Sequence, residues 1–274
     1  AHRLNQFSGL YGNQGENQAK EIISASHLSV FFLDEDQQVT WKDIGTEAEI
    51  RKHARALGAE VITDELPSQF RCAGSDGYLA WLDDLLGIRP TANSELDRGA
   101  FDVRLFDDPV SLHAAIRQAN GNNRARLVAG YCWNWSSKKN PGLNDIVIPE
   151  HGYAARWNLA AEGNTWIISA TGVEEVGCVH TCQGLEVDTI GVIIGPDLVV
   201  RDGLLQVDPT ARARSDKSLT GWRQAVARDP EATKQRVSRL IRNTYRTLMS
   251  RGMKSCWVFA CDTELQGYLR ERIG

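Results

Sequence analysis

The chain has 274 residues, of which 42% are hydrophobic, 24% charged and 8% aromatic, and its formal net charge at pH 7 is −4. This balance excludes a disordered chain, a collagen-like chain and a small scaffold held together by disulfides. No apolar run approaches the roughly 20 residues that a membrane-spanning helix needs, so we expect no membrane segment.

The N-terminal part of the chain alternates between helical and strand-like patterns. Residues 16–26 are helical in composition, and residues 27–33, HLSVFFL, read as a buried strand that ends at three acidic residues. A second helix is predicted from Thr46, which acts as its N-cap with Glu49 three residues later in a capping box. Gly58 then suits the C-terminal end of that helix.

The rest of the chain continues the alternation. Helices are predicted at residues 76–86, 109–119 and 230–249 and after Asp262, and strands at 101–106, 125–131, 188–194 and 255–260. Near-continuous apolar strands separated by helices indicate an α/β fold with a mostly parallel sheet covered on both faces. Ligands of such sheets bind beyond the carboxyl ends of the strands, which directs attention to residues 34–37, 132–135 and 182–186. Residues 201–230 read as a polar insertion or long loop.

The charge is unevenly distributed. Residues 210–274 carry 14 Lys and Arg against 6 Asp and Glu, although the whole chain is acidic. Such a segment can bind a polyanion, but on charge alone a solvated basic helix face is favoured. Arg239, Arg242 and Arg246 follow helical spacing and form the predicted basic stripe.

The six cysteines lie mostly in apolar runs, which predicts reduced thiols in a cytoplasmic protein. Because the chain begins at Ala1 rather than at a methionine, export with a cleaved leader stays open. Cys178, His180 and Cys182 raise the question of a zinc hydrolase. A second ligand pair at zinc spacing is absent from the sequence, so we predict no metal site.

Five short segments remain as carriers of chemistry: AHRLN at 1–5, FFLDEDQ at 31–37, QFRC at 69–72, VHTCQGLEVDTIGVIIG at 179–195 and NTYRTLMSRGMK at 243–254. The phosphate-loop pattern G-x-x-x-x-G-K-[ST] does not occur in the chain. The order of the five segments resembles the motif set of superfamily 1 helicases. More closely, it resembles the bacterial helicase-like family related to the C-terminal helicase region of Schlafen proteins.

The resemblance implies a RecA-like fold with flanking helices. Residues 1–64 would be the C-terminal remnant of a first RecA-like domain, and residues 65–274 a complete second one. The chain would begin inside the Walker B sequence Asp-Glu-Ala-His, with the acidic pair and the phosphate loop in a missing N-terminal half. ATP and Mg²⁺ would then bind the full-length parent. We expect neither to bind this chain tightly, and we expect this chain not to hydrolyse ATP.

The resemblance also implies roles for individual residues. Gln37 would sense the γ-phosphate, Arg71 would reach it across the cleft, and Arg251 would be the arginine finger. Glu186 would bind the nucleotide ribose in a loop shaped by Gln183 and Gly184. The motif-V-like residues His180 and Thr181 would lie near the backbone of a single-stranded nucleic acid, DNA or RNA.

Two readings stay open beside this one. Trp133 and Trp135 follow a predicted strand, where they could stack on nucleic-acid bases or simply pack in the core. The chain could also be a nucleic-acid-binding or protein-interaction module on a RecA-like scaffold without motor activity, because fold alone does not fix function.

Overall fold

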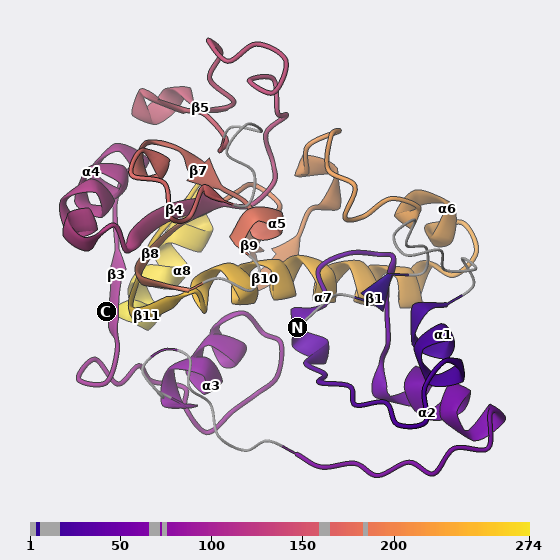
Figure 1. The fold of residues 1–274 in the computed structure, drawn as a ribbon. Helices are drawn as coiled ribbons and strands as arrows, with labels where there is room; N and C mark the ends of the chain where they lie inside the picture. Colours follow the sequence, from indigo (N-terminus) through magenta and orange to yellow (C-terminus); the bar gives the residue numbers. More distant parts are fainter. Residues whose placement is uncertain (1–3, 6–16, 66–71, 73–75, 159–164, 183–185) are drawn as a thin grey trace.

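The computed structural model describes residues 4–5, 17–65, 72, 76–158, 165–182 and 186–274. Its centre is a five-stranded sheet in the order β3-β11-β8-β4-β7, in which every neighbouring pair is parallel (Figure 1). The strands are β3 (Asp102–Leu105), β4 (Ala125–Ala129), β7 (Val176–Gly177), β8 (Val187–Ile194) and β11 (Gly252–Ala260). This arrangement confirms the predicted α/β fold with a parallel sheet, and it is consistent with a RecA-like fold.

Alternating side chains of each strand enter two separate hydrophobic clusters. In β8, Ile190, Val192 and Ile194 join one cluster, while Ile193 joins the other. The first cluster lies beneath α3 (Asp76–Leu85), α7 (Pro230–Met249) and α8 (Thr263–Ile273), and the second lies beneath α4 (Pro109–Ala119). Strands buried on both faces are mostly apolar, which explains the near-continuous apolar runs in the sequence.

Aspartate side chains begin three of these helices. Asp108, Asp229 and Asp262 each accept a hydrogen bond from the backbone N–H three residues later, at 2.8, 3.1 and 2.9 Å. Such caps satisfy donors that the first helical turn leaves unpaired. The start of α7 at Pro230 and the end of α3 before Gly87, whose φ is +59°, follow the predicted signals.

The N-terminal part packs on α7 through the one-turn helix η1 (Glu35–Gln37), and Val39 enters the first hydrophobic cluster. It contains α1 (Gln18–Ser24), α2 (Glu47–Ala56), η1 and the short pair β1 (Leu4–Asn5) and β2 (Asp43–Ile44). The predicted cap of α2 is confirmed, since Thr46 accepts the Glu49 N–H at 3.2 Å. The Glu49 carboxylate binds the N–H of Gly45 and the amide of Asn17, each at 2.7 Å, and thereby joins α1 to α2.

The strand predicted at residues 27–33 is wrong. The segment has no regular structure, and Leu28, Val30 and Phe32 are 82%, 69% and 72% exposed. A strand is stabilised by cross-strand pairs rather than by its own sequence. All five strands of the central sheet come from residues 102–260, so this apolar run joins no strand among the described residues.

The segment predicted as a polar insertion or long loop, residues 201–230, contains regular structure. Residues 198–226 contain the hairpin β9 (Leu198–Arg201) and β10 (Leu204–Val207), followed by α6 (Trp222–Val226). Asp202 and Gly203 form its turn with positive φ angles of 53° and 73°, as a two-residue hairpin loop requires. A second hairpin, β5 (Ile146–Ile148) and β6 (Tyr153–Ala155), projects near the carboxyl end of β4 (Figure 1). Among the described residues, no helix is long and apolar enough to cross a membrane.

A buried histidine makes the stability of the fold depend on pH. His113 on α4 has one ring nitrogen 2.9 Å from the Tyr153 hydroxyl and the other 2.9 Å from the Val173 carbonyl. A carbonyl can only accept a hydrogen bond, so Nε2 carries a proton, and in the neutral ring Nδ1 accepts a hydrogen bond from the Tyr153 hydroxyl. Burial, which outweighs the bond to the carbonyl, lowers the pKa of His113 below its ordinary 6.5.

The unfolded chain therefore binds a proton at His113 at a pH where the folded chain does not. We expect the free energy of unfolding to fall as the pH drops below about 6.5, by up to about 1.4 kcal/mol per pH unit from this residue. His113→Gln should remove that part of the slope between pH 7 and 5 in urea titrations. His27→Gln, at an exposed position, is the control; equal slopes in the two variants would contradict the assignment.

Candidate functional site

The last turns of α7 carry a row of buried polar side chains. Asn243, Thr247 and Arg251 are spaced four residues apart and are all buried, so they lie along one face of the helix end. Arg251, between α7 and β11, is only 1% exposed, and its Nε donates to the Thr247 carbonyl at 2.9 Å. The Tyr78 hydroxyl of α3 donates to the Met249 carbonyl at 3.1 Å and holds α3 against this turn.

Glu186 lies beside Arg251 at the same edge of the sheet. The N–H of Val187, which begins β8, donates to the Arg251 carbonyl at 3.0 Å, and the Glu186 side chain is exposed. Both residues directly precede a strand, so they lie at the amino edge of the sheet. They differ in this from residues 34–37 and 132–135, because the segments of Glu186 and Arg251 lead into β8 and β11.

Gln37 lies in η1, which packs on α7. The Asn243 amide donates to the carbonyls of Gln38 at 3.1 Å and Glu35 at 3.4 Å, two helical turns before Arg251. The Gln37 amide itself donates to Asp34 at 2.7 Å within its own turn. The structure thus brings the segments of Gln37, Glu186 and Arg251 together around the C-terminal half of α7.

A series of ion pairs joins α3, α7 and η1 in this region. Asp83 of α3 pairs with Arg246 of α7 and, at 2.9 Å, with Arg89, which also pairs with Asp36 next to Gln37. Burial alone would lower the pKa of Arg246, but the bond and charge of Asp83 outweigh it and raise that pKa.

The predicted basic stripe is consequently not a solvated face. Arg246 is buried in its ion pair, and Arg242 donates at 2.8 Å to the carbonyls of Leu86, Gly87 and Leu205. Arg239 remains exposed. Helical spacing correctly grouped the three arginines but could not reveal the elements that pack against them.

His180 and Thr181 occupy α5 (Val179–Cys182), at the carboxyl end of β7. The Thr181 hydroxyl accepts the Cys178 N–H at 2.9 Å and donates to the Cys178 carbonyl at 3.0 Å, so it stabilises its own turn. The exposed His180 has its ring edge-on to Tyr131 and its Nε2 3.9 Å from Asp216 Oδ1. These two predicted residues thus lie near the carboxyl ends of the strands, unlike Glu186 and Arg251.

Sequence reasoning missed a buried charged cluster that lies next to His180. Arg212 Nε is 2.6 Å from Asp216 Oδ2 and its Nη1 is 3.2 Å from Asp197 Oδ2, while the Tyr245 hydroxyl of α7 donates to Asp197. We call these four residues the carboxyl-edge cluster. Burial would raise the pKa of Asp216, but the nearby His180 ring and the charge of Arg212 outweigh it and lower that pKa. The Gly-Pro-Asp sequence directly after β8 was the signal that could have found it.

Trp133 and Trp135 follow β4 and are half-buried against the second hydrophobic cluster. The indole N–H of Trp133 donates to the Val147 carbonyl at 3.3 Å. The backbone carbonyl of Trp133 accepts a hydrogen bond from the indole N–H of Trp157 at 3.1 Å. Trp135 meets Tyr131 edge-on at 6.3 Å between ring centres. Packing therefore accounts for much of both rings.

Some predicted site residues lie outside the described residues, namely Arg71, Gln183 and Gly184. The same holds for residues 66–71, next to the predicted domain boundary after residue 64. Among the residues that the structure describes, no group of three or more His, Cys, Asp or Glu could hold a metal ion.

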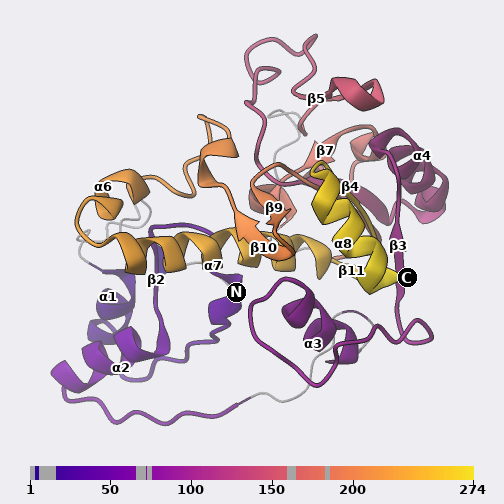
Figure 2. The same ribbon diagram turned by 180° about the vertical axis from the view of Figure 1, so that it is seen from behind.

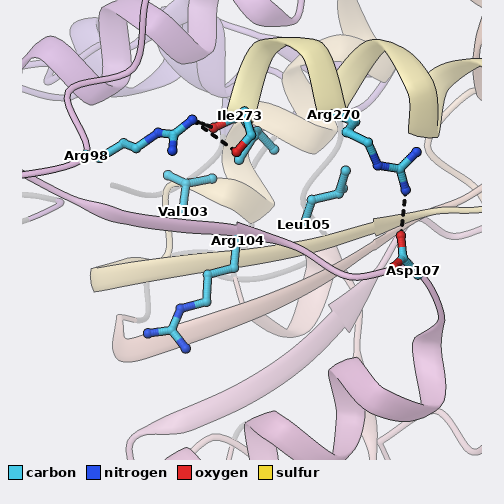
Figure 3. Close-up of a pocket in the computed structure, with 8 residues that line it drawn as sticks. Arg98, Val103, Arg104, Leu105, Asp107, Arg270 and Ile273 are labelled. Atoms are coloured by element: carbon cyan, nitrogen blue, oxygen red, sulfur yellow. Dashed lines mark hydrogen bonds and ion pairs between the residues drawn. The ribbon is translucent and has the colours of Figure 1, made fainter.

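A cavity of about 370 Å³ lies between β3 and the end of α8 (Figure 3). Arg98 donates there to the carbonyls of Ile273 and Gly274 at 2.6 and 3.0 Å, and Arg270 pairs with Asp107. None of the motif-like residues lines this cavity, so it takes no part in the candidate site.

Comparison with known proteins identifies a matching protein family and a yeast relative. The family model described as "Schlafen group 3, DNA/RNA helicase domain" matches residues 1–262. The uncharacterized protein YPL245W of Saccharomyces cerevisiae is 24% identical over 283 aligned positions, which cover 94% of this chain. The chain spans 59% of the length of that yeast protein. No solved structure matches the chain.

Proposed function

The chain belongs to the Schlafen group 3 DNA/RNA helicase domain family, and from this premise we propose that it is the C-terminal part of an ATP-dependent nucleic-acid helicase or translocase. The family supports a helicase-like region. ATP hydrolysis, the nucleic-acid partner and the missing half of the ATP site are parts of the proposal.

The observation that carries the proposal is the arrangement around α7. Three segments far apart in sequence meet at its C-terminal half: η1 through Asn243, the start of β8 through Val187, and Arg251 itself. Phosphoryl transfer depends on positioning and charge neutralisation more than on covalent chemistry. An arginine and a carboxylate fixed side by side on one sheet edge suit that task.

Each residue would contribute by its chemistry. The Arg251 guanidinium is permanently charged and matches phosphate oxygens with a planar fork, and the exposed Glu186 carboxylate can accept hydrogen bonds from ribose hydroxyls. When bound, Mg²⁺–ATP would supply the transferable phosphoryl group, with the metal held by acids outside the described residues. Because Arg251 is only 1% exposed, its side chain must be uncovered before it can reach a phosphate. Hydrolysis would then depend on a rearrangement of the segments that cover Arg251.

The test compares two proteins. Purified residues 1–274 are expected to show no ATP turnover above buffer, because the chain contains no phosphate-loop sequence. A longer protein that carries a phosphate loop before residue 1 should hydrolyse ATP, and single-stranded DNA or RNA should stimulate it. Robust turnover by residues 1–274, measured as phosphate release, would show that the proposed division of the ATP site is wrong.

One observation favours the alternative of a module without motor activity. Arg251 is buried and the Gln37 amide bonds within its own turn, so neither side chain is presented to a ligand in this arrangement. The sequence before residue 1 in the full protein discriminates the two. An intact phosphate loop there supports the ATPase, and a degenerate one supports the module.

A further inference from the structure

We propose that the loops of residues 131–140 and 210–218 together form a binding face for single-stranded nucleic acid. This inference rests on the proposed function and identifies where the nucleic acid would bind. The loops follow β4 and β10, and both lie on the opposite side of α7 from α1, α2 and α3 (Figures 1 and 2).

The two loops are joined into one surface. The Ala213 N–H donates to the Tyr131 carbonyl at 3.0 Å, and the backbone and hydroxyl of Ser215 donate to the Asn134 side-chain oxygen at 3.3 and 3.4 Å. The Ser215 and Tyr131 hydroxyl oxygens are 3.3 Å apart, within hydrogen-bonding distance. The two loops are therefore already held together, and a ligand that binds one loop can contact the other without moving it.

The exposed charges of both loops are all positive. They belong to Lys138 and Lys139 on the first loop and to Arg214 and Lys217 on the second. The one acidic residue of these loops, Asp216, has a side chain only 2% exposed and paired with Arg212. The whole chain has a net charge of −4, but this face is positively charged and therefore suits the binding of a polyanion.

An aromatic ring lies among these cations. Trp135 is half-buried, and the Lys138 ammonium is 5.7 Å from its ring centre. A base can stack on such a ring, while the neighbouring cations contact the backbone phosphates. This combination favours single-stranded nucleic acid over an acidic protein segment, which would use the charges but not the ring.

The carboxyl-edge cluster holds the second loop in place from beneath. Arg212 and Asp216 are buried members of the loop, and they tie it to Asp197 after β8 and through it to Tyr245 of α7. Arg214 and Lys217 thus project from a braced backbone, and binding would require little ordering of the loop. The face also adjoins His180, which contacts Asp216.

The experiment measures binding of residues 1–274 to fluorescent single-stranded DNA and RNA oligonucleotides by anisotropy, at several salt concentrations. Lys138→Glu with Arg214→Glu should weaken binding about tenfold or more and reduce the slope of log K against log salt by about 1.4, at roughly 0.7 per phosphate contact. The control is Lys52→Glu with Arg55→Glu, two exposed cations on α2, which changes the net charge equally. Trp135→Leu should weaken binding about 5- to 150-fold and Trp135→Phe much less.

Three results would overturn the inference. If the two double variants bind alike, the face is wrong while the proposed function stands. If polyglutamate competes as well as an oligonucleotide of equal charge, the surface recognises anions rather than nucleic acid. If the wild-type chain binds neither DNA nor RNA at low salt, the nucleic-acid partner of the proposed function fails, and the face fails with it.

Discussion

Arg251→Ala in the full-length protein is expected to lower the ATP turnover number by about 10³- to 10⁵-fold and to change ATP affinity little. An arginine finger acts on the charge that develops in the transition state, so its loss affects turnover more than binding. Turnover is measured as phosphate release under saturating single-stranded nucleic acid, and affinity with a fluorescent nucleotide.

Because Arg251 is buried, the alanine variant could lose activity by destabilising the fold. Arg251→Lys separates the two explanations, since it keeps the charge and much of the volume but lacks the planar fork. A folded lysine variant with low turnover supports the finger role. Arg239→Ala, at an exposed arginine of the same helix, should retain turnover. Near wild-type turnover in both Arg251 variants would remove Arg251 from the mechanism.

The second large effect is expected from Arg212→Ala, which should lower the free energy of unfolding by about 3–5 kcal/mol. Arg212 lies between two buried carboxylates, Asp197 and Asp216, and its removal takes away the guanidinium charge that both share. Urea unfolding followed by tryptophan fluorescence measures the change.

Arg214→Ala is the matched control, because Arg214 lies two residues away and is exposed. A surface substitution of this kind usually changes stability by no more than about 0.5 kcal/mol. A loss below about 1 kcal/mol in Arg212→Ala would mean that water reaches the two carboxylates and replaces the arginine.

The sequence correctly predicted features that depend on residues adjacent along the chain, such as the ends of helices. The cap of α2 at Thr46, the start of α7 at Pro230 and the start of α8 after Asp262 lie where the local signals placed them. The run at 27–33 shows the limit of such signals. Its alternating apolar side chains suit a strand, but pairing depends on a partner that local sequence does not specify.

The candidate site was predictable in part. The resemblance singled out Glu186 and Arg251 from segments far apart in the chain, and the structure brings them side by side. It could not indicate that Arg251 is buried, because burial depends on how α3 packs on α7. Arg212 and Asp216 were hidden for a similar reason. They lie in a polar segment that reads as a solvated loop, and only the fold brings them to Asp197.

The contacts of α7 have a consequence for how this helix can move. On one side Asn243 holds the backbone of η1, and two residues later Tyr245 is bonded to Asp197 and to the Gly195 N–H at 2.9 Å. Hydrogen bonds of this kind are either made or broken over a small displacement. A helix held by such bonds on both sides cannot shift far relative to its partners without breaking at least one of them. Displacement of α7 must therefore either break one of these contacts or carry η1 and residues 195–197 with it.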